Sequence, residues 1–210
     1  MSQYFHIHPQ NPQPRLIRQA AELLRNGGLI VYPTDSLYAF GCHIGDKAAL
    51  ERLRKIRKLH ANYNFSLVCR DLSEISTYAQ VDNSVFRLLK ATTPGPYTFI
   101  LNASKEVPRR LLHPKRKTIG IRVPNHPIPQ ALLRELGEPL LSATFSLPDR
   151  EDPIADPQEI HDAIGHAVDL VIDGQGCGYE PTTIVDLTEG YPQVLRVGKG
   201  DIKIFENDSK

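Results

Sequence analysis

Patterns typical of helices and of strands alternate along almost the whole of this 210-residue chain. Leucine, isoleucine and alanine recur at helical spacing over residues 12–26, and Gly27 and Gly28 end that segment. The apolar run at 29–32 that follows has the length of a buried strand. Because strands and helices that alternate in this way bury one another in layers, the chain is restricted to the α/β class of folds.

The same reasoning predicts the other elements. Further helices are expected from Asp46 and at 71–78, 83–92, 127–136 and 156–165, and further strands at 66–69, 97–102, 118–123, 139–144, 168–172, 182–187 and 194–197. Several connections are too short to be helical crossovers, so the sheet should be mixed. No internal repeat or long linker divides the chain. We predict one α/β domain over residues 1–205, with its sheet flanked by helices, and a tail at 206–210.

Cysteine usage and hydropathy indicate where such a chain works. The three cysteines (Cys42, Cys69 and Cys177) are an odd number without CxxC spacing, which argues against a disulfide framework and a zinc site. No apolar stretch approaches the roughly 20 residues that a membrane span needs, and no secretory signal opens the sequence. We expect a soluble protein in the cytoplasm.

Charge is segregated along the chain although the net charge is only +1. Seven cations and one acid lie between Lys105 and Arg122, whereas eleven acids and one cation lie between Asp149 and Glu189. Such a basic run either forms a solvated face or attracts the phosphates of RNA. The candidate RNA-binding residues are Arg109, Arg110, Lys115, Arg116 and Lys117.

A polar triplet, Thr34-Asp35-Ser36, directly follows the apolar strand at 29–32. Pro33 removes a backbone donor and favours an extended Tyr32, so the strand should stop there. Ligands bind at the carboxyl ends of strands in open α/β sheets. The triplet is therefore either a substrate-binding turn or a simple turn with a capping side chain.

Other polar residues stand at similar places. Lys55 and Arg57 close the second helix, where they either balance the helix dipole or share a ligand if the helix unwinds near Ile56. Arg122 and Arg196 lie in apolar strands, where each needs an anionic partner if it is buried. Hydroxyls lie at the ends of other strands, at Ser142, Thr144, Ser146, Thr182 and Thr183. Arginines and hydroxyls of this kind bind phosphates and carboxylates.

The common catalytic signatures are absent from the sequence. It contains no P-loop, GxGxxG, GxSxG or HExxH motif. His6 and His8 are two residues apart, but no third ligand accompanies them, and we expect no metal site made by side chains. From the residues alone, the chain is a phosphate-binding α/β protein.

In order, these motifs resemble those of the YrdC/YciO family over nearly the whole chain. The matching segments are Pro33 to Phe40, Lys55 and Arg57, Pro94 to Thr98, Arg122 to Pro124, Thr144 and Ser146, Thr182-Thr183 and Leu195 to Gly198. The opening MSQYFHIHP, the segment Cys69 to Ser73 and the length resemble the short YciO branch in particular. The resemblance implies a twisted mixed sheet with a concave basic surface.

The resemblance also implies an activity, ATP-dependent synthesis of L-threonylcarbamoyladenylate from L-threonine, bicarbonate and ATP. The product serves the threonylcarbamoyladenosine (t6A) modification of tRNA, so tRNA and tRNA-modification proteins are expected partners, with Mg²⁺ on the phosphates. The basic run adds double-stranded RNA as a candidate ligand. Lys55, Arg57, Thr144 and Ser146 would be catalytic. They would face ATP with Thr182 and Arg196, and Thr34, Tyr38 and Arg122 would hold threonine.

Three positions depart from the family pattern. Ser-x-Asn reads Thr144-Phe145-Ser146, Asn64 stands where a lysine is expected, and Tyr-Gly-Leu reads Tyr38-Ala39-Phe40. Weak synthase activity would agree with these departures. An RNA-binding or regulatory paralogue and a hydrolase of an acyl-adenylate are the alternatives for the same cleft.

Overall fold

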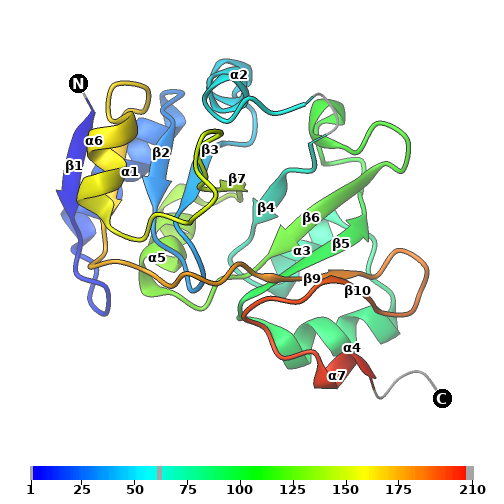
Figure 1. Ribbon diagram of the computed structural model, residues 1–210. Helices are drawn as coiled ribbons and strands as arrows, with labels where there is room; N and C mark the ends of the chain where they lie inside the picture. The colour runs from blue at the N-terminus through cyan, green and yellow to red at the C-terminus, as the bar shows by residue number, and fades with distance from the viewer. Residues whose placement is uncertain (1, 61–62, 207–210) are drawn as a thin grey trace.

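The computed structural model describes residues 2–60 and 63–206, and a twisted mixed sheet runs through the described chain (Figure 1). Its ten strands follow the order β1-β8-β2-β3-β7-β4-β6-β5-β9-β10. They are β1 (Gln3–His6), β2 (Ile30–Tyr32), β3 (Ala39–His43), β4 (Ser66–Val68), β5 (Tyr97–Asn102), β6 (Thr118–Arg122), β7 (Leu140–Thr144), β8 (Leu170–Asp173), β9 (Thr183–Asp186) and β10 (Gln193–Arg196). Four neighbouring pairs are parallel and five are antiparallel, which confirms the predicted mixed sheet.

Helices cover both faces of this sheet. They are α1 (Pro14–Arg25), α2 (Lys47–Ile56), α3 (Leu72–Tyr78), α4 (Asn83–Thr92), α5 (Pro127–Leu136), α6 (Pro157–Ile164) and α7 (Lys203–Glu206), with a 3₁₀ turn η1 (Arg109–Leu111). Aspartate side chains cap four of them: Asp46, Asp71, Asp82 and Asp156 accept bonds from first-turn N–H groups. Gly137 ends α5 in the left-handed conformation at φ 80°.

The helices α1 and α5 pack together against one half of one sheet face. Their buried side chains, among them Leu24 and Leu132, contact strand residues of β2, β8, β7 and β4 such as Ile30 and Leu170. A second apolar layer includes side chains of α2, α3, α4 and α6. The two layers bury the sheet on both sides around β2, β3 and β7.

The sheet face that α1 and α5 cover continues across β4, β6 and β5. There no helix covers it in the described chain, and small side chains line it. Gly41 pairs with Ser142, Ser142 with Ser66, Ser66 with Gly120, and Gly120 with Ile100. Residues opposite one another in a sheet point to the same face. The hydroxyl of Tyr32 lies 2.9 Å from Ser142 Oγ and marks the edge of the covered half. Beyond that edge the fold leaves room for a ligand.

The predicted helices and strands are all present, but the sequence analysis missed β1, β3, η1 and α7. Strand β3 reads Ala-Phe-Gly-Cys-His, which lacks the β-branched residues typical of strands, and we assigned it to the polar motif instead. Of the predicted tail at 206–210, residue 206 ends α7 and 207–210 lie outside the described residues. No helix in the described part of the chain is long and apolar enough to cross a membrane.

Candidate functional site

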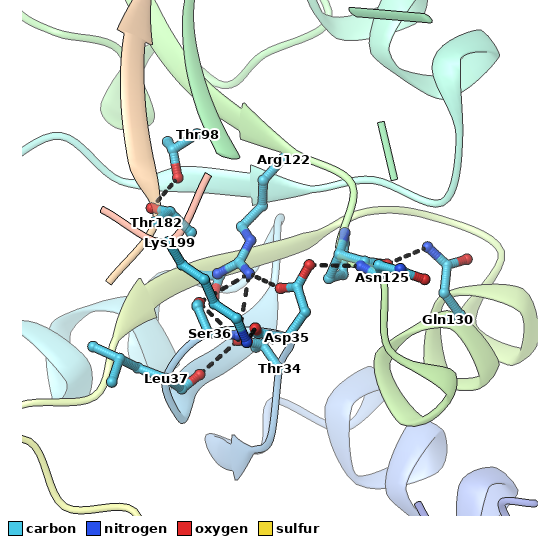
Figure 2. Close-up of polar contacts among 12 residues, drawn as sticks. Thr34, Asp35, Ser36, Leu37, Thr98, Arg122, Asn125, Gln130, Thr182 and Lys199 are labelled. Atoms are coloured by element: carbon cyan, nitrogen blue, oxygen red, sulfur yellow. Dashed lines mark hydrogen bonds and ion pairs between the residues drawn. The ribbon is translucent and has the colours of Figure 1, made fainter. Parts of the chain in front are cut away.

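The turn that joins β2 to β3 holds the Thr34-Asp35-Ser36 triplet against Arg122, at the end of β6. Arg122 Nη2 donates to the side chains of all three residues, with 3.3 Å to Thr34 Oγ1 and 3.2 Å to Ser36 Oγ. Thr34 Oγ1 donates to the carbonyl of Leu37 at 2.6 Å, which fixes the turn. Figure 2 shows these side chains converging on the guanidinium group. The triplet is therefore part of a polar cluster.

The charged side chains of this cluster are buried, so each needs a partner of opposite charge. The side chains of Arg122 and Asp35 are only 8% and 9% exposed. Of the two Asp35 carboxylate oxygens, one pairs with Arg122 and the other accepts a bond from Asn125 N at 2.8 Å. Arg122 thus points inward rather than to solvent, and it has the anionic partner that a buried arginine needs. Its Nε has no acceptor among the described residues, which leaves hydrogen-bonding capacity for a ligand.

A second arginine lies across the open face. Arg196 donates from Nη2 to the carbonyl oxygen of Thr182 at 2.8 Å, and Thr182 Oγ1 lies 2.8 Å from Thr98 Oγ1 (Figure 2 shows the two threonines). Partial burial lowers the pKa of Arg196 below its ordinary value, and the charge of Arg122 lowers it further. An anion here would relieve both effects.

Arg57 forms a third group with Ser146 and Tyr63. Its Nη2 donates to Ser146 Oγ, its Nη1 donates to the Tyr63 hydroxyl at 2.9 Å, and its guanidinium carbon lies 5.3 Å from the Tyr63 ring centroid. Nε of Arg57 is buried without an acceptor among the described residues. The fold thus brings Arg57 into contact with Ser146, which lies 89 residues away in the sequence.

These groups border one cavity on the open half of the sheet. Its lining residues are Ala39, Tyr63, Asn64, Ser66, Thr98, Ile100, Gly120, Arg122, Ser142, Ala143, Thr144, Thr182, Ile184 and Arg196. Gly120 lies in the lining, and a Cβ there would lie 2.6 Å from Ser66 Oγ, so a larger residue would displace that hydroxyl. Guanidinium groups and hydroxyls line the cavity, and such a set can bind carboxylates and phosphates.

Two predicted site residues lie elsewhere. Helix α2 ends at Ile56. The preceding Lys55 lines a separate surface depression, together with other residues of α2 and with Arg110 of η1. Arg57 caps α2 with a helical backbone conformation, so the helix does not unwind near Ile56, and of the two arrangements that the sequence left open the helical one is present. Tyr38 is fully buried, and its hydroxyl accepts a bond from Gly174 N at 3.4 Å instead of facing the cavity. Burial also raises the pKa of Tyr38 above its usual value.

The basic run lies on η1 and the loop before β6. Arg109, Lys115 and Lys117 are exposed, whereas Arg110 Nη2 donates to the carbonyl of Gly45 at 2.7 Å. Arg116 lies 3.8 Å from Asp186, which partly neutralises it. The RNA-binding role of these five residues stays a prediction.

Several site residues escaped the sequence analysis. Asp35 lies in the triplet, but its pairing with Arg122 spans 87 residues and has no local signal. Ser66 and Gly120 belong to short strands, where small residues at alternate positions would have indicated an open face. No sequence feature pointed to Tyr63 or to Lys199, whose Nζ donates to the carbonyl oxygen of Asp35 at 2.6 Å.

Metal-binding capacity in the described residues is low. No group of three or more histidine, cysteine, aspartate or glutamate side chains lies together there in a way that could hold an ion. The cavity residue Arg122 is paired with the carboxylate of Asp35, and both oxygens of that carboxylate have protein partners. A magnesium ion that enters with a nucleotide would depend on phosphate oxygens for its coordination.

Fold and site together define a class: an α/β protein whose mixed sheet carries an open, arginine- and hydroxyl-lined cavity on one face. The family model Sua5_yciO_yrdC, described as "Telomere recombination", matches residues 22–198. This chain belongs to that Sua5/YciO/YrdC family, as its ordered motifs predicted.

Two curated relatives differ in how similar they are to this chain. YciO of Escherichia coli strain K12 is 60% identical over 205 residues, which cover 98% of this chain and all of that protein. A threonylcarbamoyl-AMP synthase of Coxiella burnetii strain RSA 493 is 31% identical over 183 residues, or 86% of this chain and 96% of the synthase. The chain is thus much more similar to YciO than to this synthase.

Solved structures agree with the fold. The crystal structure of Escherichia coli YciO superposes with a TM-score of 0.94 at 60% identity and covers 98% of this chain and all of its own. The Pyrococcus abyssi Sua5 structure complexed with L-threonine has a TM-score of 0.88 at 23% identity and covers 97% of this chain and 60% of its own. The second likeness supports the fold alone.

Proposed function

We propose that this chain binds ATP and L-threonine in the cavity and, with bicarbonate, forms L-threonylcarbamoyladenylate, the activated intermediate for t6A modification of tRNA. The observation that carries the proposal is the arrangement around the cavity. Arg122 with the Thr34 turn, Arg196 with Thr182, and Thr144 lie at one cavity, and the Arg57–Ser146 pair borders it through Tyr63. The similarity to synthases supports the same activity.

In this proposal the reaction needs orientation and charge neutralisation more than an acid or a base. The threonine amine combines with bicarbonate to give a carbamate and water. A carbamate oxygen then attacks the α-phosphorus of ATP, and the bond to pyrophosphate breaks. Arg57 and Arg196 would neutralise the phosphates, while Arg122 and the Thr34 turn would hold threonine.

The departures from the family pattern affect charge more than shape. Phe145 is buried and packs on Phe40 with ring centroids 5.1 Å apart, so neither ring fills the cavity. In contrast, Asn64 lines the cavity where the pattern has a lysine, and Lys55 lies on another surface. A triphosphate would therefore meet fewer cations, and we propose that synthase activity is weak.

The test is a pyrophosphate-release assay on the purified protein with ATP, L-threonine and bicarbonate. We expect release when all three are present, and loss of release when any one is omitted. Arg57→Ala should reduce it about tenfold or more, because an arginine–phosphate contact is worth about 1.5–3 kcal/mol. Lys55→Ala is the matched control and should leave the rate within twofold, since Lys55 lines a separate depression whereas Arg57 contacts the cavity residue Tyr63.

A double substitution tests whether the departures from the family pattern, rather than the fold, limit the activity. Thr144→Ser with Ser146→Asn recreates the family pattern beside Arg57 and should raise the rate. No pyrophosphate release from either protein would rule out the synthase proposal. The hydrolase alternative predicts a different result. The protein would release AMP from supplied threonylcarbamoyladenylate, and Arg57→Ala would abolish that release. The smaller number of cations at the cavity agrees with this alternative too.

A further inference from the structure

The backbone of Lys199 is held beside Thr182, a residue of the cavity wall. The segment that leaves β10 turns against Pro181 and Thr182: Lys199 N donates to the Pro181 carbonyl oxygen at 2.9 Å. The preceding Gly198 donates to Thr183 Oγ1 at 3.0 Å, and a Cβ on Gly198 would lie 2.3 Å from the Pro181 oxygen. Only glycine permits this close approach. The position of the Lys199 backbone is therefore fixed next to Thr182, which lines the cavity.

From there the side chain reaches across to the turn after β2. Its Nζ donates to the backbone carbonyl oxygen of Asp35 at 2.6 Å. Figure 2 shows the Lys199 side chain passing in front of Arg122, with its nitrogen beside the Thr34–Ser36 turn. Two cations thus approach the same turn from different elements, Arg122 from β6 and Lys199 from the segment after β10.

Only one of these two cations, Arg122, is paired with a carboxylate. Both oxygens of Asp35 are engaged, by Arg122 Nη2 and by Asn125 N. Lys199 forms no ion pair with a carboxylate among the described residues, and its one protein hydrogen bond there is to a neutral carbonyl. An ammonium group has three donors, so two remain. This side of the cavity therefore carries uncompensated positive charge that suits one anionic ligand group.

We propose that Lys199 Nζ binds the carboxylate of the amino-acid substrate. The inference rests on the proposed function, because it assumes that the Thr34 turn and Arg122 hold an amino acid. The phosphates have other candidates in Arg57 and Arg196, whereas the turn has no other lysine among the described residues. The Lys199 ammonium group would act as a compact positive charge, and the planar guanidinium of Arg122, at the end of β6, would supply further N–H donors.

The experiment measures binding by isothermal titration calorimetry, without ATP, using L-threonine and L-threoninamide as ligands. Threoninamide replaces the carboxylate by a neutral amide and keeps the rest of the molecule. Lys199→Met should weaken threonine binding about tenfold or more and change threoninamide binding less than twofold, since a hydrogen bond to a charged group is worth about 1.5–3 kcal/mol. Lys199→Arg should keep part of the affinity, and Lys203→Met, an exposed lysine on α7, is the control.

Each outcome has one meaning. If Lys199→Met weakens both ligands equally, or neither, the carboxylate contact is wrong and Lys199 only ties the chain to the turn. A lowered melting temperature together with equal loss for both ligands would establish that structural role. If the wild-type protein binds threonine but Lys199→Met has no effect, the inference fails while the proposed function stands. If the wild-type protein does not bind threonine, both fail.

Discussion

At the scale of single residues, the Arg122–Asp35 pair holds the site together. Both side chains are buried, and the pair connects the turn after β2 to the end of β6. Burying two charges is costly, but removing one partner costs more, because the other is left uncompensated in a poorly solvated place. Asp35 also accepts a bond from Asn125 N, so its charge orients the segment before α5.

We predict that Arg122→Met lowers the free energy of unfolding by about 3–5 kcal/mol, the usual effect of breaking a buried ion pair. Urea denaturation followed by circular dichroism measures it. Arg109→Met removes an exposed arginine and is the matched control, with an expected change below about 0.5 kcal/mol. Asp35→Asn should recover part of the loss when combined with Arg122→Met. Additive effects of the two substitutions would contradict the prediction.

At the scale of elements, helix α5 begins at an N-cap that can titrate, His126. The ring nitrogen Nδ1 of His126 accepts a bond from Ile128 N at 3.2 Å. Partial burial lowers the pKa of His126 below its usual 6.5, and the nearby charge of Asp35 opposes this shift. The folded state therefore favours the neutral ring, which is the form that can act as the cap.

Stability should follow that titration. A pKa that is lower in the folded than in the unfolded state gives stabilisation that is complete above about pH 6.5, the pKa of the unfolded chain, and is lost as pH falls through the folded value. We expect the wild-type protein to lose about 1 kcal/mol, the worth of a cap, relative to His126→Asn between pH 7.5 and pH 5. Urea unfolding at several pH values tests this, and parallel profiles for the two proteins would refute it.

The elements also show how far sequence can predict this molecule. Segments with strong periodicity or a clear cap, such as α1 and the helix after Asp46, were predicted because their signals are local. Strand β3 was missed because pairing with β2 and β7, rather than its own composition, makes it a strand. The separation of Lys55 from Arg57 depends on where α2 ends, and helix ends are hard to predict to the residue.

At the scale of the whole molecule, the cations gather at two separate places, the cavity and a depression on α2. Lys55 joins Lys47, Arg54 and Arg110 around an exposed depression on α2, outside the cavity. Glu51 is the single acid in its lining. Arg110 comes from the basic run and reaches the carbonyl oxygens of Ile44 and Gly45, so the fold brings that run beside α2. The sequence analysis assigned Lys55 to ATP binding and Arg110 to RNA binding, whereas the structure places the two side by side in one depression.

This arrangement sets the final prediction, that RNA binds over α2 and η1. A phosphate backbone bound by several lysines and arginines releases counterions, so affinity falls with salt in proportion to the contacts made. Lys47→Gln with Lys55→Gln should weaken tRNA binding and reduce the slope of log K against log salt by about two, one for each phosphate contact. Fluorescence anisotropy at 50–200 mM salt measures the slope, with Lys203→Gln as the control. An unchanged slope would contradict the prediction and place any RNA site elsewhere. Pyrophosphate release should be unaffected by the two substitutions, because neither lysine lines the cavity.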